Sequence, residues 1–424
     1  MAQPRAISVQ PSPANPRPFF SPHLSPPLPF SSHSTPSNLR SLSCCRTIHR
    51  RCRRFRVKVA AASGSAAPTQ SELSGSLKDI YECCSIWKWR GYSINFLVKG
   101  TGPPLLLVHG FGASIAHWRR NIGVLSENYT VYAIDLLGFG SSDKPPGFSY
   151  TMEVWSQLII DFLSEIIKNP TILIGNSVGS LACVIAASVA AVCHWFLSQL
   201  DVKNAFLHGD LQHEMIVVPQ VDTALTLEDI LLHGATRNKA TGGLVRAIVL
   251  LNCAGGMNNK AIVDDWRIRL ILPLLWLFDF LLNQRIIASA IFENVKKREN
   301  LYNILLSVYG NKEAVDEDLI EIVKRPADDA GALDAFVSIV SGPPGPNPMS
   351  LMPKVTVPVL LLWGDQDPFT PIDGPVGKYF SSLPLQLSNV SLYMLEGVGH
   401  CPHDDRPDLV HEKLLPWLAA LPSI

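Results

Sequence analysis

Ser177 is the residue best suited to chemistry, because it stands in the sequence Gly-Asn-Ser-Val-Gly at 175–179, directly after the apolar run 171–174. A serine between two glycines at a strand-to-helix junction is typical of a nucleophile elbow, whose tight turn lifts the hydroxyl clear of the sheet. Side chains at the glycine positions would collide with strand and helix, and the positive end of the helix favours the negative charge that develops during attack. The pattern predicts Ser177 as a nucleophile.

A serine hydroxyl needs a base, and the base needs an orienting carboxylate. Two candidate carboxylates, Asp365 and Asp367, follow the apolar run 360–364. We predict Asp367 as the acid, because it lies further beyond the strand and the next residue, Pro368, can hold the turn that aims it. Asp365 remains the alternative and would otherwise cap the turn.

Two candidate bases, His400 and His403, follow the predicted strand at 390–396. Gly397 and Gly399 allow the close approach that a catalytic loop requires. His400 is therefore predicted as the base, and His403 remains the alternative. Both histidines, like both aspartates, come after the carboxyl ends of predicted strands, which is where parallel sheets place their sites.

The oxyanion that forms during acyl transfer needs two backbone N–H donors. One is expected from Val178, the residue after the nucleophile, and the other from the loop His-Gly-Phe-Gly at 109–112, through Phe111. His109 is then a structural residue. The glycine-rich loop 135–143 lacks the spacing of phosphate-binding loops and is interpreted as loop structure near the site.

These residues must be positioned by a sheet, and apolar runs that alternate with helical patterns predict one. The first two runs, separated by Gly91, are expected to pair antiparallel; the later ones are continuously apolar, as in parallel strands covered on both faces. Helices are expected at 151–167, with Thr151 as N-cap, and at 407–421. The predicted fold class is α/β with an eight-stranded, mostly parallel sheet, whose strands are expected at 84–90, 92–98, 105–109, 130–135, 171–176, 245–251, 357–363 and 390–396.

Residues 256–345 contain helical patterns only and are predicted to form a helical cap. Within it the stretch 270–282 is very apolar, but Pro273 and Asp279 interrupt it. The uninterrupted run is far below the ~20 residues of a membrane span. We expect a lid helix packed on the core, and peripheral contact of the cap with a membrane is the alternative.

The first 71 residues contain no Asp or Glu but nine Arg and one Lys, and ten prolines stand before residue 37. An Arg-rich, Ser-rich and acid-free N-terminus is typical of an organelle transit peptide, and the prolines disfavour the amphipathic helix of a mitochondrial signal. We therefore predict a chloroplast protein, stromal or thylakoid-associated. The predicted division of the chain is a transit peptide at 1–65, a first core part at 66–255, the cap at 256–345 and a second core part at 346–424.

The 424 residues are 47% hydrophobic and 17% charged, with a formal net charge of +0, which is typical of a globular protein. Beyond residue 71, 26 basic residues face 36 acidic ones, so a nucleic-acid partner is not expected. The nine cysteines form no CxxC pair, and neither a zinc site nor a redox motif is indicated. The predicted chemistry requires no metal and no organic cofactor.

Residues of roughly 84–185 and 244–421 resemble the α/β-hydrolase superfamily. The resemblance rests on the segments HGFG, DLLGFGSSDKP, GNSVG, WGDQDPFTP and GVGHCPHDDRP. Within the superfamily the chain is similar to plant chloroplast hydrolases related to pheophytinase, and more distantly to bacterial carbon–carbon bond hydrolases and haloalkane dehalogenases. The resemblance implies the α/β-hydrolase fold and hydrolysis of a large apolar ester. Ser177 argues against dehalogenase chemistry, which uses an Asp nucleophile, and Ser180 stands where a further Gly is usual.

The predicted function is hydrolysis of a carboxylic ester of an apolar small molecule through an acyl-enzyme. Ser177 attacks, His400 relays the proton, Asp367 orients the imidazolium, and the N–H groups of Phe111 and Val178 hold the oxyanion. Two alternatives remain: cleavage of a carbon–carbon bond with the same triad, and a small-molecule receptor with a vestigial triad.

One segment does not fit the resemblance to the α/β-hydrolase superfamily. Residues of about 188–220 resemble the reverse transcriptase of copia-type retrotransposons, in which Asp201 would be a metal ligand. The Tyr-x-Asp-Asp motif that polymerisation also needs is missing, so we interpret 188–243 as a foreign insertion, either a transposon remnant or an error in the gene model. It lies between the helix after the nucleophile and the next strand, at the sheet edge opposite the elbow. Long insertions there cost little loop-closure entropy, so we expect catalysis to survive.

Overall fold

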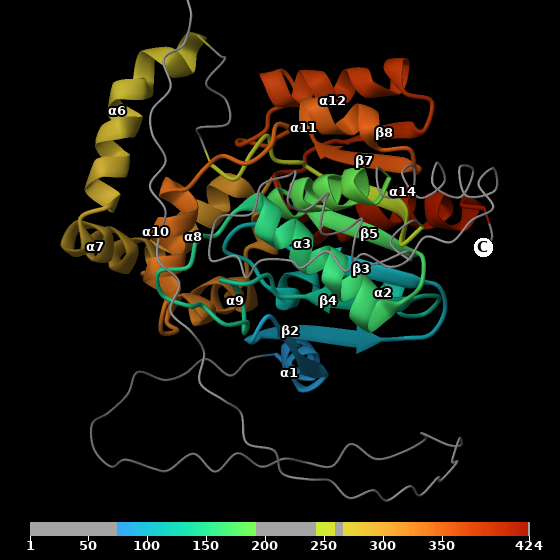
Figure 1. Ribbon diagram of the computed structural model, residues 1–424, viewed down its shortest axis with the longest axis horizontal. Coiled ribbons are helices and arrows are strands. Elements are labelled where there is room, and N and C mark those ends of the chain that lie inside the picture. Colours follow the sequence, from blue (N-terminus) through green and yellow to red (C-terminus); the bar gives the residue numbers. More distant parts are fainter. Residues whose placement is uncertain (1–73, 192–242, 259–265, 423–424) are drawn as a thin grey trace, which may run out of the picture. The chain divides into compact units, whose positions relative to one another are not determined.

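The computed structural model describes residues 74–191, 243–258 and 266–422. Its centre is an eight-stranded sheet in the order β1-β2-β4-β3-β5-β6-β7-β8 (Figure 1). β1 pairs antiparallel with β2, and β2 with β4, whereas all other neighbours are parallel. The predicted fold class is confirmed. The strands are β1 (Cys84–Trp89), β2 (Tyr92–Lys99), β3 (Pro104–Val108), β4 (Thr130–Ile134), β5 (Thr171–Asn176), β6 (Val245–Leu251), β7 (Val359–Gly364) and β8 (Val390–Leu395).

The register of the central strands separates the site from the predicted insertion. Thr171 at the start of β5 pairs with Val245 at the start of β6, and Asn176 pairs with Leu251 at their ends. Ser177 follows the carboxyl ends, whereas the described chain resumes at residue 243 beside the opposite ends. The predicted transit peptide and residues 192–242 of the predicted insertion lie outside the described residues.

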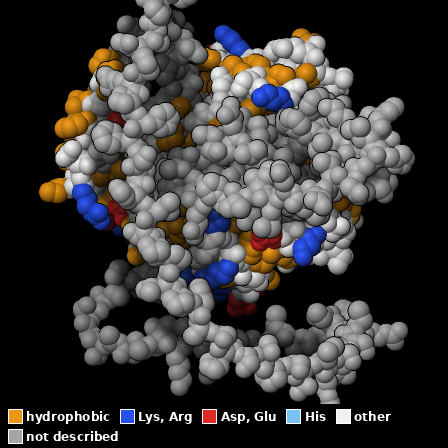
Figure 2. Space-filling model, viewed as in Figure 1, with side chains coloured by type: hydrophobic (Ala, Val, Ile, Leu, Met, Phe, Trp, Pro, Cys, Tyr) orange, Lys and Arg blue, Asp and Glu red, His pale blue; other side chains and the backbone are white. Residues whose placement is uncertain are grey.

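Helices α6 to α10 lie in the chain between β6 and β7. Pro273 lies inside α6 and does not end it. We expected this apolar stretch to pack on the core, and for five of its residues the prediction is wrong. The side chains of Leu274, Trp276, Leu277, Phe278 and Phe280 are exposed and form part of the apolar edge seen in Figure 2. No helix in the described part of the chain is long and apolar enough to cross a membrane. The helices are α6 (Trp266–Leu282), α7 (Arg285–Val295), α8 (Arg298–Val308), α9 (Glu317–Ala327) and α10 (Ala332–Ser341).

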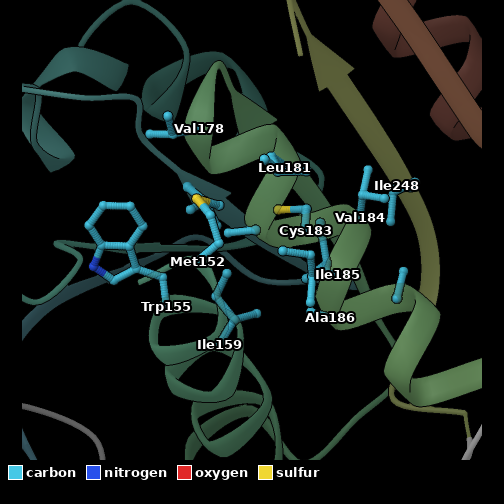
Figure 3. Close-up of a cluster of buried hydrophobic side chains, with 14 of the residues drawn as sticks. Met152, Trp155, Ile159, Val178, Leu181, Cys183, Val184, Ile185, Ala186 and Ile248 are labelled. Carbon is cyan, nitrogen blue, oxygen red and sulfur yellow. The ribbon is translucent and has the colours of Figure 1, made fainter. Parts of the chain in front are cut away.

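Further helices cover both faces of the sheet. One face is packed by α3 (Met152–Phe162), the helix that begins at residue 178, and α12 (Pro375–Gln386). Figure 3 shows Met152, Trp155 and Ile159 of α3 beside the helix from residue 178, where all of these side chains are buried. The other face is packed by α1 (Gly75–Glu82), α2 (Ile122–Leu125) and α14 (Pro407–Ala420).

The start of α3 follows from its capping residue. The side chain of Thr151 accepts a hydrogen bond from the Val154 N–H (3.2 Å), as the predicted N-cap should. The expected helix reaches residue 167, but its last turn, Leu163–Ile167, is a wider π turn. Lys168, in the left-handed conformation (φ 62°), ends it.

Candidate active site

Ser177 sits in a strained turn. Its φ is +55°, a conformation that residues with a side chain rarely adopt. A Cβ at Gly175 would lie 2.5 Å from the Ser180 nitrogen, and one at Gly179 would lie 2.4 Å from the His109 carbonyl oxygen. Only glycine fits these two positions, as the motif predicts. Ser180 uses its hydroxyl to bind the Gly175 carbonyl oxygen (2.7 Å), so this departure from the usual Gly adds a contact between helix and strand.

Asp367 and His400 form a direct pair. Nδ1 of His400 lies 2.8 Å from Oδ2 of Asp367, and both side chains are buried. The carboxylate also accepts hydrogen bonds from the Thr370 hydroxyl (2.5 Å), the Asn252 amide (2.5 Å) and the N–H groups of Phe369 and Thr370. Burial opposes ionisation, but the hydrogen bond and charge of His400, with the bonds from Asn252 and Thr370, lower the pKa of Asp367 to about 2.

The competing aspartate points elsewhere. Asp365 is exposed, and its carboxylate accepts a hydrogen bond from the Val398 N–H at 3.3 Å. It therefore braces the turn before His400, whereas Asp367 contacts the imidazole itself.

The loop that carries His400 lies against the elbow. Nδ2 of Asn176, the residue before the predicted nucleophile, donates a hydrogen bond to the His400 carbonyl oxygen (3.0 Å). Among the described residues, no hydrogen bond joins the Ser177 hydroxyl to the His400 ring. Catalytic hydrogen bonds of this kind often form only when substrate binds. The structure thus brings Asp367 and His400 into contact and joins the His400 backbone to the residue before Ser177.

His403 belongs to a different, buried network. Its Nε2 lies 3.2 Å from Nδ1 of His117, whose Nε2 lies 2.7 Å from the Tyr309 hydroxyl. Tyr309 donates to Asp404 (3.1 Å), which pairs with Arg119 (3.0 Å). Burial lowers the pKa of His403 well below its usual value, and the neighbouring His117 lowers it further. A histidine held neutral inside this network is poorly placed to act as the base.

A second set of hydrogen bonds ties the cap to the His400 loop. The His400 N–H donates to the carbonyl oxygen of Val308, at the end of α8 (2.9 Å). The buried carboxylate of Asp405 accepts hydrogen bonds from Gly399 (2.6 Å) and from Gly310 (2.8 Å). The loop that holds the predicted base therefore rests on the cap as well as on β8.

The predicted oxyanion donors belong to two segments, the helix after Ser177 and the 109–112 loop. Val178 begins the helix, and the first N–H groups of a helix have no intrahelical acceptor. A Cβ on Gly110 would lie 3.2 Å from the Ser177 Cβ, so the 109–112 loop adjoins the elbow. His109 is fixed between Gly110 and Leu136 by hydrogen bonds of 2.7 and 3.0 Å, which fits the predicted structural role.

Asn252 is a site residue that sequence reasoning missed. It follows β6, adopts a positive φ of 45°, and donates to Asp367 through Nδ2 while its Oδ1 accepts from the Gly364 N–H (3.0 Å). A polar residue directly after a buried strand was the available signal, because Asp367 was found by the same rule.

A cavity of about 120 Å³ lies behind Phe111, between the core loops and the cap. Its wall is apolar, and the ring of Phe111 contacts those of Phe139 (5.7 Å between centroids) and Phe336 (6.2 Å). Lys144 reaches the wall, but its ammonium group is bound to the Gly140 carbonyl oxygen (2.6 Å) and to Asp329 (2.8 Å). The predicted oxyanion residue Phe111 therefore lines this apolar space, whereas Ser177, Asp367 and His400 do not. No group of three or more metal-binding side chains occurs in the part of the chain that the structure describes.

This sheet order, with an elbow after β5, an aspartate after β7 and a histidine after β8, is that of the α/β hydrolases. Residues 105–413 match the model of the alpha/beta hydrolase family, so the chain belongs to that family.

Known proteins similar to this chain include the uncharacterized hydrolase YugF of Bacillus subtilis (strain 168), 23% identical over 314 residues that cover 74% of this chain and 89% of YugF. The chloroplastic pheophytinase of Arabidopsis thaliana is 22% identical over 360 residues, which cover 76% of this chain and 62% of that protein. Among solved structures, a serine hydrolase involved in carbazole degradation (CarC) superposes with a TM-score of 0.53 at 20% identity, covering 79% of this chain and 98% of CarC.

Proposed function

We propose that the protein is a serine esterase that cleaves a carboxylic ester with an apolar group. The observation that carries the proposal is the buried contact between His400 and Asp367, on a loop hydrogen-bonded to the residue before Ser177. With its pKa lowered to about 2, Asp367 is ionised at neutral pH and favours the imidazolium that forms during attack.

The proposed reaction has two steps. The Ser177 oxygen attacks the ester carbonyl carbon while Nε2 of His400 accepts the serine proton, and the N–H groups of Phe111 and Val178 bind the oxyanion. Collapse of this intermediate passes the proton to the departing alcohol and leaves an acyl-Ser177. Water then attacks the acyl carbon, again with His400 as base, and releases the carboxylic acid and the free serine.

The cavity behind Phe111 supports an apolar substrate group. At about 120 Å³ it is somewhat smaller than a cavity of ~150 Å³ that binds benzene, so it fits a group of roughly six carbon atoms. A larger ester would place one branch there and the remainder outside. Kinship to a protein named pheophytinase makes pheophytin a test substrate, and the acid-free N-terminus together with that relative's chloroplastic name supports a chloroplast location, stromal or thylakoid-associated.

Labelling with a fluorophosphonate probe tests the nucleophile. We expect the wild-type chain and a Ser180→Ala control to be labelled, and Ser177→Ala to lose all labelling. The control is matched, since Ser180 lies only three residues after Ser177 but its hydroxyl is bound to the Gly175 carbonyl oxygen. Equal labelling of the wild type and Ser177→Ala would refute the proposal.

Substrate panels test the bond that is cleaved. We expect turnover of aryl and alkyl esters with acyl chains of up to about six carbons and no cleavage of vinylogous 1,5-diketones, the substrates of carbon–carbon hydrolases. Cleavage of the diketones alone would show that the protein is a carbon–carbon bond hydrolase and not an esterase. Labelling without turnover of either class would indicate a receptor that retains the triad. Fusing residues 1–65 to a fluorescent protein tests the location independently, with import into chloroplasts as the expected result.

A further inference from the structure

The surface formed by α6 and the start of α7, here called the α6 surface, concentrates exposed apolar side chains. Of the sixteen large apolar side chains exposed in the described part of the chain, seven lie within one stretch of 14 residues. Contiguous apolar surface of this kind marks a docking site. The seven residues are Leu274, Trp276, Leu277, Phe278, Phe280, Ile286 and Ile287.

The exposed positions wind around the helix. Trp276, Leu277 and Phe278 are consecutive and are 71%, 51% and 41% exposed. Consecutive residues of an α-helix point about 100° apart, so these three span roughly 200° of its circumference. A protein groove that binds a helix covers one stripe of residues spaced three and four apart. The acyl chains of a lipid surface surround an inserted helix more widely, which fits the observed exposure.

The charges beside this stretch also fit a lipid surface. Arg285 follows the end of α6, and its side chain is 82% exposed and lies 3.7 Å from the carboxylate of Asp334. Asp279 is the single acidic residue of α6. Cations that flank exposed aromatic and aliphatic side chains are typical of helices that lie in the headgroup region of an anionic membrane. With 17 residues α6 is shorter than the ~20 residues a span needs, so it would lie in the surface and not cross it.

The α6 surface adjoins the walls of the apolar cavity. α6 packs against α7 and α10. Phe292 of α7 and Phe336 of α10 line the cavity, with their ring centroids 5.1 Å apart. An apolar ester dissolves preferentially in lipid, so a docked protein would meet such a substrate through the same helices that enclose the cavity.

We propose that the α6 surface docks the protein onto an anionic lipid surface. Trp276 and Phe280 insert among the acyl chains, and Arg285 lies at the headgroups. Docking is a binding property that is measured without turnover, so it stands or falls separately from the proposed esterase activity.

Flotation of the full chain with vesicles tests the proposal. We expect binding to phosphatidylcholine vesicles that contain phosphatidylglycerol and weaker binding to phosphatidylcholine alone. A double variant, Trp276→Ser with Phe280→Ser, should lower the partition coefficient by roughly tenfold or more, because two aromatic side chains no longer leave water. Arg285→Glu should reduce binding to the anionic vesicles several-fold and leave binding to neutral vesicles unchanged.

The matched control is a double variant at two exposed apolar residues elsewhere, Ile86→Ser with Leu385→Ser, which are 56% and 92% exposed. It should bind vesicles like the wild type. Circular dichroism and thermal unfolding of each variant show that the fold is intact, whether or not the protein reacts with a fluorophosphonate. A wild type that does not bind either kind of vesicle, or an equal loss in the two double variants, would overturn the proposal. So would a wild type that sediments as a dimer and ignores vesicles while Trp276→Ser with Phe280→Ser is a monomer, since the α6 surface would then bind a second copy of the chain.

Discussion

Replacing Asp367 by Asn tests the charge that the structure places behind His400. The substitution keeps the size of the side chain but removes its charge and exchanges one acceptor oxygen for an N–H₂ donor. Asp367 is surrounded by donors: the His400 ring, the Asn252 amide, the Thr370 hydroxyl and two backbone N–H groups. The new amide group must therefore face at least one donor, and the imidazole loses the carboxylate that fixes its tautomer.

The size of the stability effect follows from the pKa of the carboxyl group. Its ordinary value of 3.8 falls to about 2 in the folded protein, which corresponds to about 2 kcal/mol of stability at neutral pH. Because the pKa is lowered by folding, this contribution is complete above pH 4 and is lost as the pH falls through about 2. The Asp367→Asn variant should therefore be less stable at pH 7, and the difference should narrow between pH 4 and pH 2.

The activity effect should be larger. Loss of the orienting carboxylate lowers turnover by roughly 10³–10⁴ in serine hydrolases that keep their geometry. The assays are kcat/KM on a soluble ester, the rate of fluorophosphonate labelling, and chemical unfolding at pH 7 and at pH 3.

Asp365→Asn is the matched control, because it changes the same group two residues earlier. Asp365 is exposed, and within the described residues its carboxylate accepts a hydrogen bond only from the Val398 N–H, so less than tenfold loss of activity is expected. If Asp365→Asn were the more damaging substitution, or if Asp367→Asn kept full activity, the assignment of the acid would be refuted.

Two further predictions follow from close contacts. In Gly399→Ala the new Cβ would lie 2.1 Å from the Val308 carbonyl oxygen, so the His400 loop must shift and fluorophosphonate labelling should slow about 10²-fold. In the control Gly397→Ala the new Cβ meets no atom within 4 Å, so the labelling rate should be kept, while the positive φ of this residue lowers the stability by about 1–2 kcal/mol. Equal labelling rates of the two variants would contradict the argument. In Phe336→Trp the larger ring fills the cavity, so KM for a hexanoate ester should rise roughly tenfold while KM for an acetate ester stays unchanged. Equal effects on the two KM values would show that the acyl chain does not bind in the cavity.

The sheet could be predicted from the sequence because the residues within each strand already indicate whether its faces are buried. Leu105 to Val108 of β3 are apolar at every position and are fully buried, since both faces of the strand are covered. The elbow was equally local, because its strand, serine and glycines lie within ten residues.

The acid and the base could only be narrowed to pairs of candidates. Asp365 and Asp367 lie on the same turn, and two residues of difference decide whether a carboxylate faces Val398 or the imidazole. His403 lies three residues after His400, in the short helix α13 (Pro402–Asp405), yet it is fixed by His117, 286 residues earlier. Contacts between segments so far apart leave no local pattern, and one sequence gives no access to them.

The prediction that the apolar stretch in α6 packs on the core was wrong for a related reason. Hydrophobicity predicts that a segment avoids water but not what covers it. Leu282 of this helix is buried, whereas Trp276 is not, although apart from Asp279 every residue between them is apolar. Which residues of such a helix face solvent depends on its angle to α7 and α10, and that angle is set by packing.

The cap does more than enclose a cavity, because it also sets the position of the predicted base. The His400 N–H binds Val308, and Asp405 draws Gly399 and Gly310 to one carboxylate. A Cβ at Gly310 would lie 2.2 Å from the Gly397 carbonyl oxygen, so the two loops touch with no room for a side chain. A displacement of the end of α8 must therefore move the His400 loop or break these hydrogen bonds.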